Sequence, residues 1–149
     1  MSGKYFNRIK QFMTLASNKE THMKSLTQAR LIHADEGNVK IELEVLKEHT
    51  NPFGTLHGGY SSTLIDNVTT MALISTIKGS PGVSVDLHVS FLSSAKIGET
   101  IVVEATVVKS GKNLAFSEGK IYNKATNALV ASGLHTQAFP YNPLAVKEK

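Results

Sequence analysis

The chain has 149 residues, the length of one ordinary domain, and this length is enough to bury a substantial core. Its formal net charge of +4 suits an anionic partner, but the 16 lysines and arginines form no basic stripe interleaved with aromatic residues. We therefore expect no nucleic acid partner. The absence of cysteine excludes disulfides, thiolate metal ligands and a catalytic thiol, and no apolar run reaches the ~20 residues that an integral membrane segment needs.

Residues 1–29 are predicted to form an N-terminal helix and a linker. Four apolar residues recur there at helical spacing, namely Phe6, Ile9, Met13 and Ala16. The stretch is basic up to Glu20 and so also resembles a weak transit peptide, although it contains little arginine or serine. We favour an amphipathic helix docked on a main domain, residues 30–139. The tail, residues 140–149, has no periodic pattern and is expected to be flexible.

The main domain is predicted to open with a β-hairpin and a long buried helix. Arg30–Asp35 and Val39–Leu46 read as the two strands, joined by a turn at Gly37 and Asn38. A loop rich in Thr, Gly, Asn and Pro follows, and an apolar helical pattern then runs from Gly58 to about Ile77. The sequence Lys78-Gly79-Ser80-Pro81-Gly82 is typical of a helix end.

Four long strands are predicted to complete the domain. Val83–Phe91 alternates apolar and polar residues and is therefore expected to be half buried. An antiparallel meander follows, with strands at Glu99–Lys109, Leu114–Asn123 and Leu129–Ala138. The predicted fold class is α+β, a curved antiparallel sheet wrapped around one long helix. Such a sheet leaves an edge strand that a second subunit can pair with, so we expect a dimer.

Asp66 is the first candidate for chemistry, because it is the only Asp, Glu, Lys or Arg between His49 and Ile77. A carboxylate on an apolar helix calls for a reason, since charged groups are seldom buried without a partner. Perturbed carboxylates concentrate at active sites. The alternatives are a carboxylate bonded to the hydroxyls three and four residues away, or one that faces solvent.

Gly58 and Gly59 stand at the predicted start of the same helix. Free backbone N–H groups and the helix dipole favour negative charge there, so the pair suits an oxyanion, although a tight turn explains it equally well. Eight residues separate Gly58 from Asp66, which is ~12 Å along a helix. If both act in one reaction, the carboxylate must come from a second, antiparallel subunit.

Other hydrolytic schemes find little support. The sequence contains no G-x-S-x-G and no H-E-x-x-H, and its six histidines are scattered, so no catalytic metal is expected. His57 adjoins the proposed oxyanion turn and is a candidate for orienting the substrate, whereas the other histidines are read as surface or packed residues. Ser84, on the polar side of its strand, is a candidate for holding a water molecule, and Asn51 for orienting the same water or the carbonyl group. Both are otherwise read as ordinary polar residues.

Three motifs resemble those of the hotdog-fold thioesterases, within the PaaI-like thioesterase superfamily and closest to its acyl-CoA thioesterases. They are Asn51-Pro52-Phe53-Gly54-Thr55-Leu56-His57-Gly58-Gly59, Asp66-Asn67 and Pro81-Gly82-Val83-Ser84-Val85-Asp86. The resemblance extends over roughly Arg30 to Thr136. It implies a hotdog fold assembled as a dimer of dimers, a homotetramer, that hydrolyses medium- and long-chain fatty acyl-CoA.

The resemblance also implies roles for individual residues. Asp66 would be the general base or the nucleophile, and Gly58 of the other subunit would supply the oxyanion N–H. Asn51 and His57 would position the thioester, and Ser84 would hold the water. The CoA phosphates would contact the turn formed by Lys109, Ser110, Gly111, Lys112, Asn113 and Leu114. Gln137 and Ala138 follow the His-Thr pair where related chains are more basic, which puts a phosphate contact there in doubt.

No cofactor is expected, because CoA is part of the substrate. The resemblance further implies a location in the cytosol, with mitochondria as the alternative, and a lipid-binding protein as a partner. Two other functions stay open on these residues. A dehydratase or hydratase acting on acyl thioesters would use His57 and Asp66 as an acid/base pair, and an acyl-CoA sensor would need no catalytic carboxylate.

Overall fold

The structure is a computed structural model that describes residues 3–140, and the expected tail therefore lies outside the described residues except for Pro140. The elements follow in the order α1 (Gly3–Ser17), η1 (His22–Leu26), β1 (Arg30–Asp35), β2 (Asn38–Glu44), η2 (Lys47–His49), α2 (Gly58–Ile74), β3 (Val83–Phe91), β4 (Thr100–Ser110), β5 (Leu114–Asn123) and β6 (Leu129–Ala138). The N-terminal helix is thus present, and the 3-10 helices η1 and η2 were not predicted.

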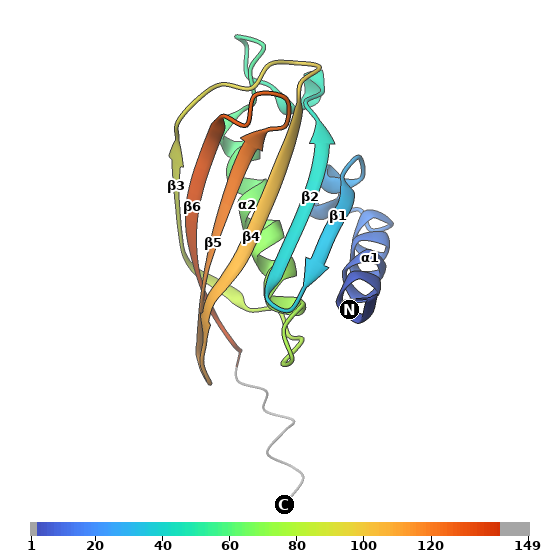
Figure 1. Cartoon of the computed structure of the whole chain (residues 1–149), viewed down its shortest axis with the longest axis vertical. Helices are drawn as coiled ribbons and strands as arrows, with labels where there is room; N and C mark the ends of the chain where they lie inside the picture. The colour runs from blue at the N-terminus through green and yellow to red at the C-terminus, as the bar shows by residue number, and fades with distance from the viewer. Residues whose placement is uncertain (1–2, 141–149) are drawn as a thin grey trace, which may run out of the picture.

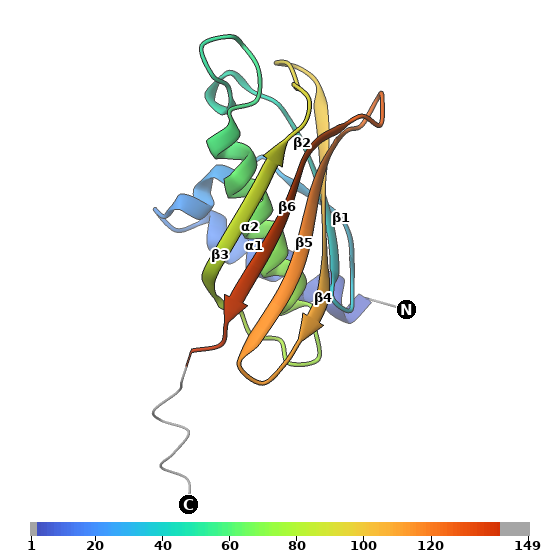
Figure 2. The same ribbon diagram turned by 90° about the vertical axis from the view of Figure 1, so that its left-hand side faces the viewer.

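The strands form one six-stranded sheet in the order β1-β2-β4-β5-β6-β3, and every neighbouring pair is antiparallel. The sheet curves around α2, which lies along its concave face (Figures 1 and 2). Helix α1 lies beside the edge strand β1 (Figure 1). This arrangement confirms the predicted architecture. It also places β1 and β3 at the two edges of the sheet.

The main core lies between α2 and the concave face of the sheet. The side chains of Leu64, Ile65, Val68 and Met71 on α2 are fully buried. They face buried aliphatic residues of the strands, among them Val39, Ile41, Ile101, Val103 and Ile121. Burial of a large aliphatic side chain contributes about 1.5–3 kcal/mol, so this interface accounts for much of the stability of the fold.

Helix α1 docks through its own apolar stripe and through one cation. Ile9 is fully buried, as its helical spacing with Phe6 and Met13 predicts. Arg8 Nη1 donates to Ile74 O and to Thr76 O, both at 3.0 Å, at the C-terminal end of α2. The guanidinium therefore satisfies carbonyl groups that a helix end leaves without partners.

Several element boundaries differ from the predictions, by one or two residues where β2 ends at Glu44 and at both ends of β4, and by more at the end of α2. Helix α2 ends at Ile74, three residues before the expected Ile77, and the chain passes through Gly79 with φ of 64°. The hairpin turn is formed by Glu36 and Gly37, where φ is 67°, so that Asn38 already pairs within the ladder. In both places glycine takes a left-handed conformation that other residues adopt at a cost.

Strand β3 has the predicted bounds but not the predicted burial. Its apolar residues are mainly exposed, with Val83 at 58%, Val85 at 61% and Phe91 at 59%. The expectation of a half-buried strand is thus wrong within the single chain, because β3 pairs with β6 alone and nothing covers its other edge among residues 3–140. A long apolar edge of this kind is a site for pairing with another strand.

Candidate active site

Asp66 lies in the middle of α2, and its side chain is 45% exposed. The hydroxyls of Ser62, Thr63, Thr69 and Thr70 do not bind its carboxylate. Each donates to a backbone carbonyl three or four residues earlier in the helix. Among residues 3–140 no donor lies within hydrogen-bonding distance of the carboxylate. The alternative of a carboxylate bonded to these hydroxyls is therefore wrong, and both carboxylate oxygens of Asp66 lack a hydrogen-bond donor among the described residues.

Ser84 approaches the same region from β3. Its Oγ lies 2.8 Å from Nε2 of His135, a buried residue of β6, and the same Nε2 lies 3.8 Å from Oδ1 of Asp66. A bulge between Ser84 and Asp86 shifts the register of β3 against β6 at this point. Bulges often re-aim side chains beside functional sites. Ser84, Asp66 and His135 thus converge, although they come from three different elements.

His135 is the functional candidate that the sequence did not reveal. On β6 the residues that face α2 are small or polar, including Gly133, His135 and Gln137, whereas Leu134 is exposed. Hydrophobic alternation therefore predicts the wrong inward face. No sequence signal marks His135, because its register partner on β3 is Leu87 and its contact with Ser84 exists only in the folded chain. Burial lowers the pKa of His135, and the carboxylates of Asp66 and Asp86 oppose that shift.

The N-terminus of α2 holds the second group of predicted residues. His57 is the N-cap, and its Nδ1 accepts the N–H of Gly59 at 2.8 Å. The N–H of Gly58 has no acceptor among residues 3–140, so it stays available at the positive end of the helix dipole. The turn is therefore both a helix cap and a potential oxyanion site.

Asn51 shapes the loop in front of this helix. Its Oδ1 accepts the N–H groups of Phe53 at 3.0 Å and Thr55 at 3.2 Å, and its Nδ2 donates to Thr55 Oγ1 at 2.8 Å. One amide hydrogen remains unused in these contacts. Asn51 and Gly58 line a common groove of about 360 Å³, which the exposed ring of Phe91 borders. We call this feature the Gly58 groove.

The predicted residues thus form three groups that a single chain keeps apart. Asp66 and Ser84 do not line the Gly58 groove. Eight helical residues separate Gly58 from Asp66, or ~12 Å. The β4–β5 turn with Lys109 to Leu114 lies at the opposite end of the molecule from the Gly58 loop (Figures 1 and 2).

The β4–β5 turn is exposed and basic. Lys109, Lys112 and Asn113 are all exposed there. A further cation joins them, because Lys78 Nζ donates to Lys112 O at 3.2 Å and lies 3.2 Å from the centroid of the Phe139 ring. Three ammonium groups near an exposed turn suit a phosphate-bearing ligand.

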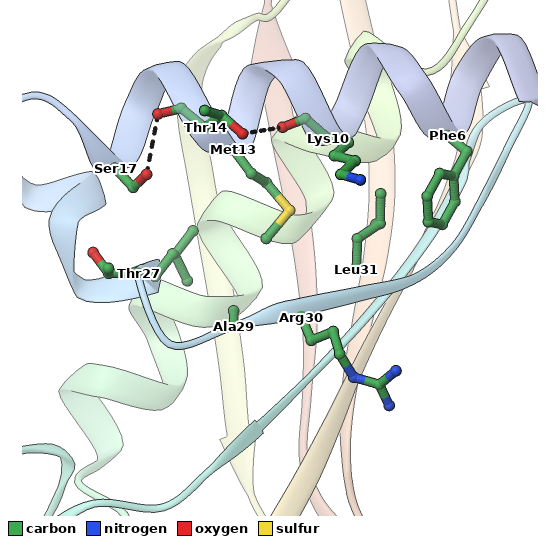
Figure 3. Close-up of a pocket in the computed structure, with 10 residues that line it drawn as sticks. Phe6, Lys10, Met13, Thr14, Ser17, Thr27, Ala29, Arg30 and Leu31 are labelled. Atoms are coloured by element: carbon green, nitrogen blue, oxygen red, sulfur yellow. Dashed lines mark hydrogen bonds between the residues drawn. The ribbon is translucent and has the colours of Figure 1, made fainter.

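A separate groove of about 400 Å³ lies between α1 and the segment leading into β1 (Figure 3). Phe6, Met13 and Leu31 form its apolar lining, and Lys10 lies beside them. None of the predicted site residues lines this groove. Within residues 3–140 no three His, Cys, Asp or Glu side chains come together to hold a metal ion, and no helix has the length and apolar character needed to span a membrane.

Comparison with known proteins decides the family. The family described as the thioesterase superfamily matches residues 53–129. The chain belongs to the thioesterase superfamily. It is 50% identical over 125 residues to human acyl-coenzyme A thioesterase 13, a match that covers 84% of this chain and 87% of that protein.

Two solved structures extend the comparison to the fold. Zebrafish thioesterase superfamily member 2 has a TM-score of 0.88 at 38% identity, covering 91% of this chain and 98% of that one. Thioesterase superfamily member 2 from Mus musculus has a TM-score of 0.86 at 38% identity, covering 94% and 100%. The predicted family, the hotdog fold and the thioesterase class are confirmed. The roles of individual residues stay predictions.

Proposed function

We propose that this protein hydrolyses fatty acyl-CoA thioesters to free fatty acid and CoA. The observation that carries the proposal is the carboxylate of Asp66, which is partly exposed on an otherwise uncharged helix and has no hydrogen-bond donor among residues 3–140. A free carboxylate that lies near the same histidine nitrogen as a serine hydroxyl suits the activation of water. The name of the human relative supports CoA thioesters as the substrate class.

In the proposed reaction, Asp66 accepts a proton from water while the water oxygen bonds to the thioester carbonyl carbon. The carbonyl oxygen becomes an oxyanion, for which the free N–H of Gly58 is a donor. Collapse of this intermediate breaks the C–S bond, and the CoA thiolate takes up the proton that Asp66 accepted. Asn51 and His57 position the thioester, and Ser84 holds the water. The alternative, direct attack by Asp66 and hydrolysis of the resulting anhydride, uses the same carboxylate.

Each site is proposed to combine Asp66 of one subunit with Gly58 of another. Two observations support this arrangement. The ~12 Å between the two residues along α2 is too long for one carbonyl group to contact both. The exposed apolar edge of β3 can pair with a second copy around a two-fold axis, which turns the two α2 helices antiparallel.

The CoA part of the substrate is proposed to bind at the turn from Lys109 to Leu114. An antiparallel partner brings this end of one subunit toward the Gly58 loop of the other, because the two features lie at opposite ends of each chain (Figure 1). The ammonium groups of Lys109 and Lys112 then meet the phosphates. Gln137 is buried and Ala138 carries no charge, so neither adds a cation there.

Several finer expectations belong to the same proposal. The acyl chains are of medium and long length, the dimers assemble into a tetramer, and no cofactor is needed besides the CoA of the substrate. A lipid-binding protein is the proposed partner, and the cytosol, with mitochondria as the alternative, is the proposed location. These expectations rest on the sequence resemblance.

Release of free CoA from a chain-length series of acyl-CoA substrates tests the function. In Asp66→Asn we expect CoA release to fall by about 10²–10⁴-fold, the usual contribution of a general base. Acyl-CoA binding, measured by calorimetry, should persist. Asp35→Asn, the same change at an exposed position of β1, is the matched control and should retain activity.

The alternatives give different outcomes in this assay. If the protein is a sensor, the wild type binds acyl-CoA but releases no CoA. If it is a hydratase or dehydratase, the wild type alters the acyl chain and leaves the thioester intact. Wild-type turnover by Asp66→Asn would contradict the proposed mechanism.

A further inference from the structure

His135 has a polar partner at each ring nitrogen, although its side chain is almost fully buried. Nδ1 lies 2.6 Å from Thr69 Oγ1 on α2, and Nε2 lies 2.8 Å from Ser84 Oγ on β3. Oδ1 of Asp66 is 3.8 Å from Nε2, beyond hydrogen-bonding distance. The imidazole therefore links a buried helix hydroxyl to Ser84, and its Nε2 also lies close to Asp66.

The hydroxyl of Thr69 decides which nitrogen carries the proton. Thr69 Oγ1 lies 2.7 Å from Ile65 O and 2.9 Å from Asp66 O, and both oxygens can only accept. Its single hydrogen is directed to these carbonyls, a common arrangement for threonine inside helices. Toward His135 the Thr69 oxygen then offers a lone pair, which requires a hydrogen on Nδ1.

We propose that Thr69 fixes His135 as the Nδ1–H tautomer, and that His135 thereby orients the hydroxyl of Ser84 for the reaction at Asp66. This inference rests on the proposed function. With Nδ1 protonated, Nε2 presents a lone pair and accepts the O–H of Ser84. Ser84 has no second hydrogen, so its oxygen faces the site as an acceptor.

Two acceptors orient a water molecule for attack. A water between Ser84 Oγ and the Asp66 carboxylate donates one hydrogen to each, so its lone pairs point away from both and toward a bound carbonyl carbon. Asp66 then takes the hydrogen that already points at it. The opposite tautomer would donate to Ser84 and turn the serine hydrogen toward this water, which removes one acceptor. His135 is thus a positioning residue that acts through Ser84.

The surroundings of His135 favour the neutral ring. Burial lowers its pKa, while the carboxylates of Asp66 on α2 and Asp86 on β3 act in the opposite sense. On β5 its register partner is Ser117, which is uncharged. Protonation at acid pH would fill Nε2 with a hydrogen, so Ser84 would lose its acceptor.

The test is the tautomer of His135 in full-length protein labelled with ¹⁵N-histidine, read from two-bond ¹H–¹⁵N correlations. We expect a protonated Nδ1 and a bare Nε2 in the wild type. Thr69→Val keeps the shape of the side chain but removes the acceptor, so the Nδ1–H signature should be lost and kcat should fall by up to roughly 100-fold with KM unchanged. Thr69→Ser should restore both the tautomer and kcat.

A wild-type His135 protonated at Nε2 overturns the inference, and so does a Thr69→Val variant with an unchanged tautomer and kcat. The wild-type spectrum decides even if a variant fails to fold. The proposed function fails separately, through full activity of Asp66→Asn, and that result would leave the tautomer unaffected.

Discussion

Gly119 of β5 and Gly133 of β6 are partners across the antiparallel ladder, and Ile65 of α2 packs against both. A Cβ on either glycine would lie 3.0 Å from Ile65 Cγ2. The missing side chains let the helix approach the sheet closely at the residue next to Asp66. The depth of α2, and with it the position of the carboxylate relative to Ser84, thus depends on this glycine pair.

Gly133→Ala is expected to lower both stability and activity. The new Cβ would lie 3.0 Å from Ile65 Cγ2 and 3.0 Å from His88 O, so the helix and β3 must both shift. We expect a loss of about 1–3 kcal/mol in the free energy of unfolding, the usual cost of overpacking, together with a lower kcat. Denaturant unfolding and CoA release measure the two effects. Gly3→Ala, where nothing lies within 4 Å, is the control and should change neither.

Arg8→Met tests how α1 stabilises the domain. The change removes two hydrogen bonds from the guanidinium to Ile74 O and Thr76 O while it keeps much of the side-chain volume. We expect a loss of about 1.5–3 kcal/mol in the free energy of unfolding, because the bonds involve a charged donor. Lys10→Met removes an exposed charge from the same helix. An equal loss in both variants would show that helix charge, not the contact with α2, is responsible.

The stability of the protein should fall as pH falls through the histidine range. Burial lowers the pKa of both His49 and His135 below the ordinary value of 6.5. The unfolded chain therefore binds protons below about pH 6.5 that the folded chain does not, and the free energy of unfolding decreases until the lowered pKa values are passed. His49→Gln and His135→Gln should each reduce this slope in unfolding experiments between pH 7 and 5. A slope that neither variant changes would contradict the prediction.

Lys112→Ala is expected to raise KM for acyl-CoA and to leave kcat nearly unchanged, because the residue lies far from the reacting carbonyl in the proposed complex. The effect should shrink at high salt, since it depends on attraction between ammonium and phosphate groups. Lys24→Ala removes an exposed cation that pairs with Glu20 near α1 and serves as the control. A fall in kcat with constant KM would contradict a role in CoA binding.

Much of the fold was predictable because its patterns are local. The bounds of β3, β5 and β6 match the predictions, since alternating residues and turn signals mark both ends. The burial of β3 was not predictable from the same alternation, because periodicity does not reveal whether a strand lies at an edge. Helix α2 ended early for a related reason, as the apolar residue Ile77 continues the pattern beyond the last helical turn.

Part of the candidate site was likewise predictable from the sequence, and part was not. Asp66 and Gly58 were found because an isolated charge and a glycine pair stand out against an apolar helix. His135 was missed because its role depends on tertiary contacts with Thr69 and Ser84, which are distant in sequence. Strand β6 turns its small and polar residues inward, so hydrophobicity could not reveal which face carries the histidine.

The shared site requires the backbone N–H of Gly58. Substitution of Gly58 by proline removes this N–H. Gly58 is the first residue of α2, a position that tolerates proline, and His57 has φ of −67° and ψ of 132°, which suits the residue before proline. Gly58→Pro should lose activity without loss of fold. Gly58→Ala keeps the N–H and adds only a Cβ 3.2 Å from the Phe91 ring, so the difference between the two variants isolates the N–H.

Subunit complementation between Asp66→Asn and Gly58→Pro tests the central claim most directly. Each variant alone should be inactive. Equal amounts refolded together should recover about one quarter of wild-type CoA release, because half of the dimers are hybrids and each hybrid restores one of its two sites. Hybrids that form, as verified by native mass spectrometry, but release no more CoA than the separate variants would contradict a site shared between Asp66 and the partner's Gly58.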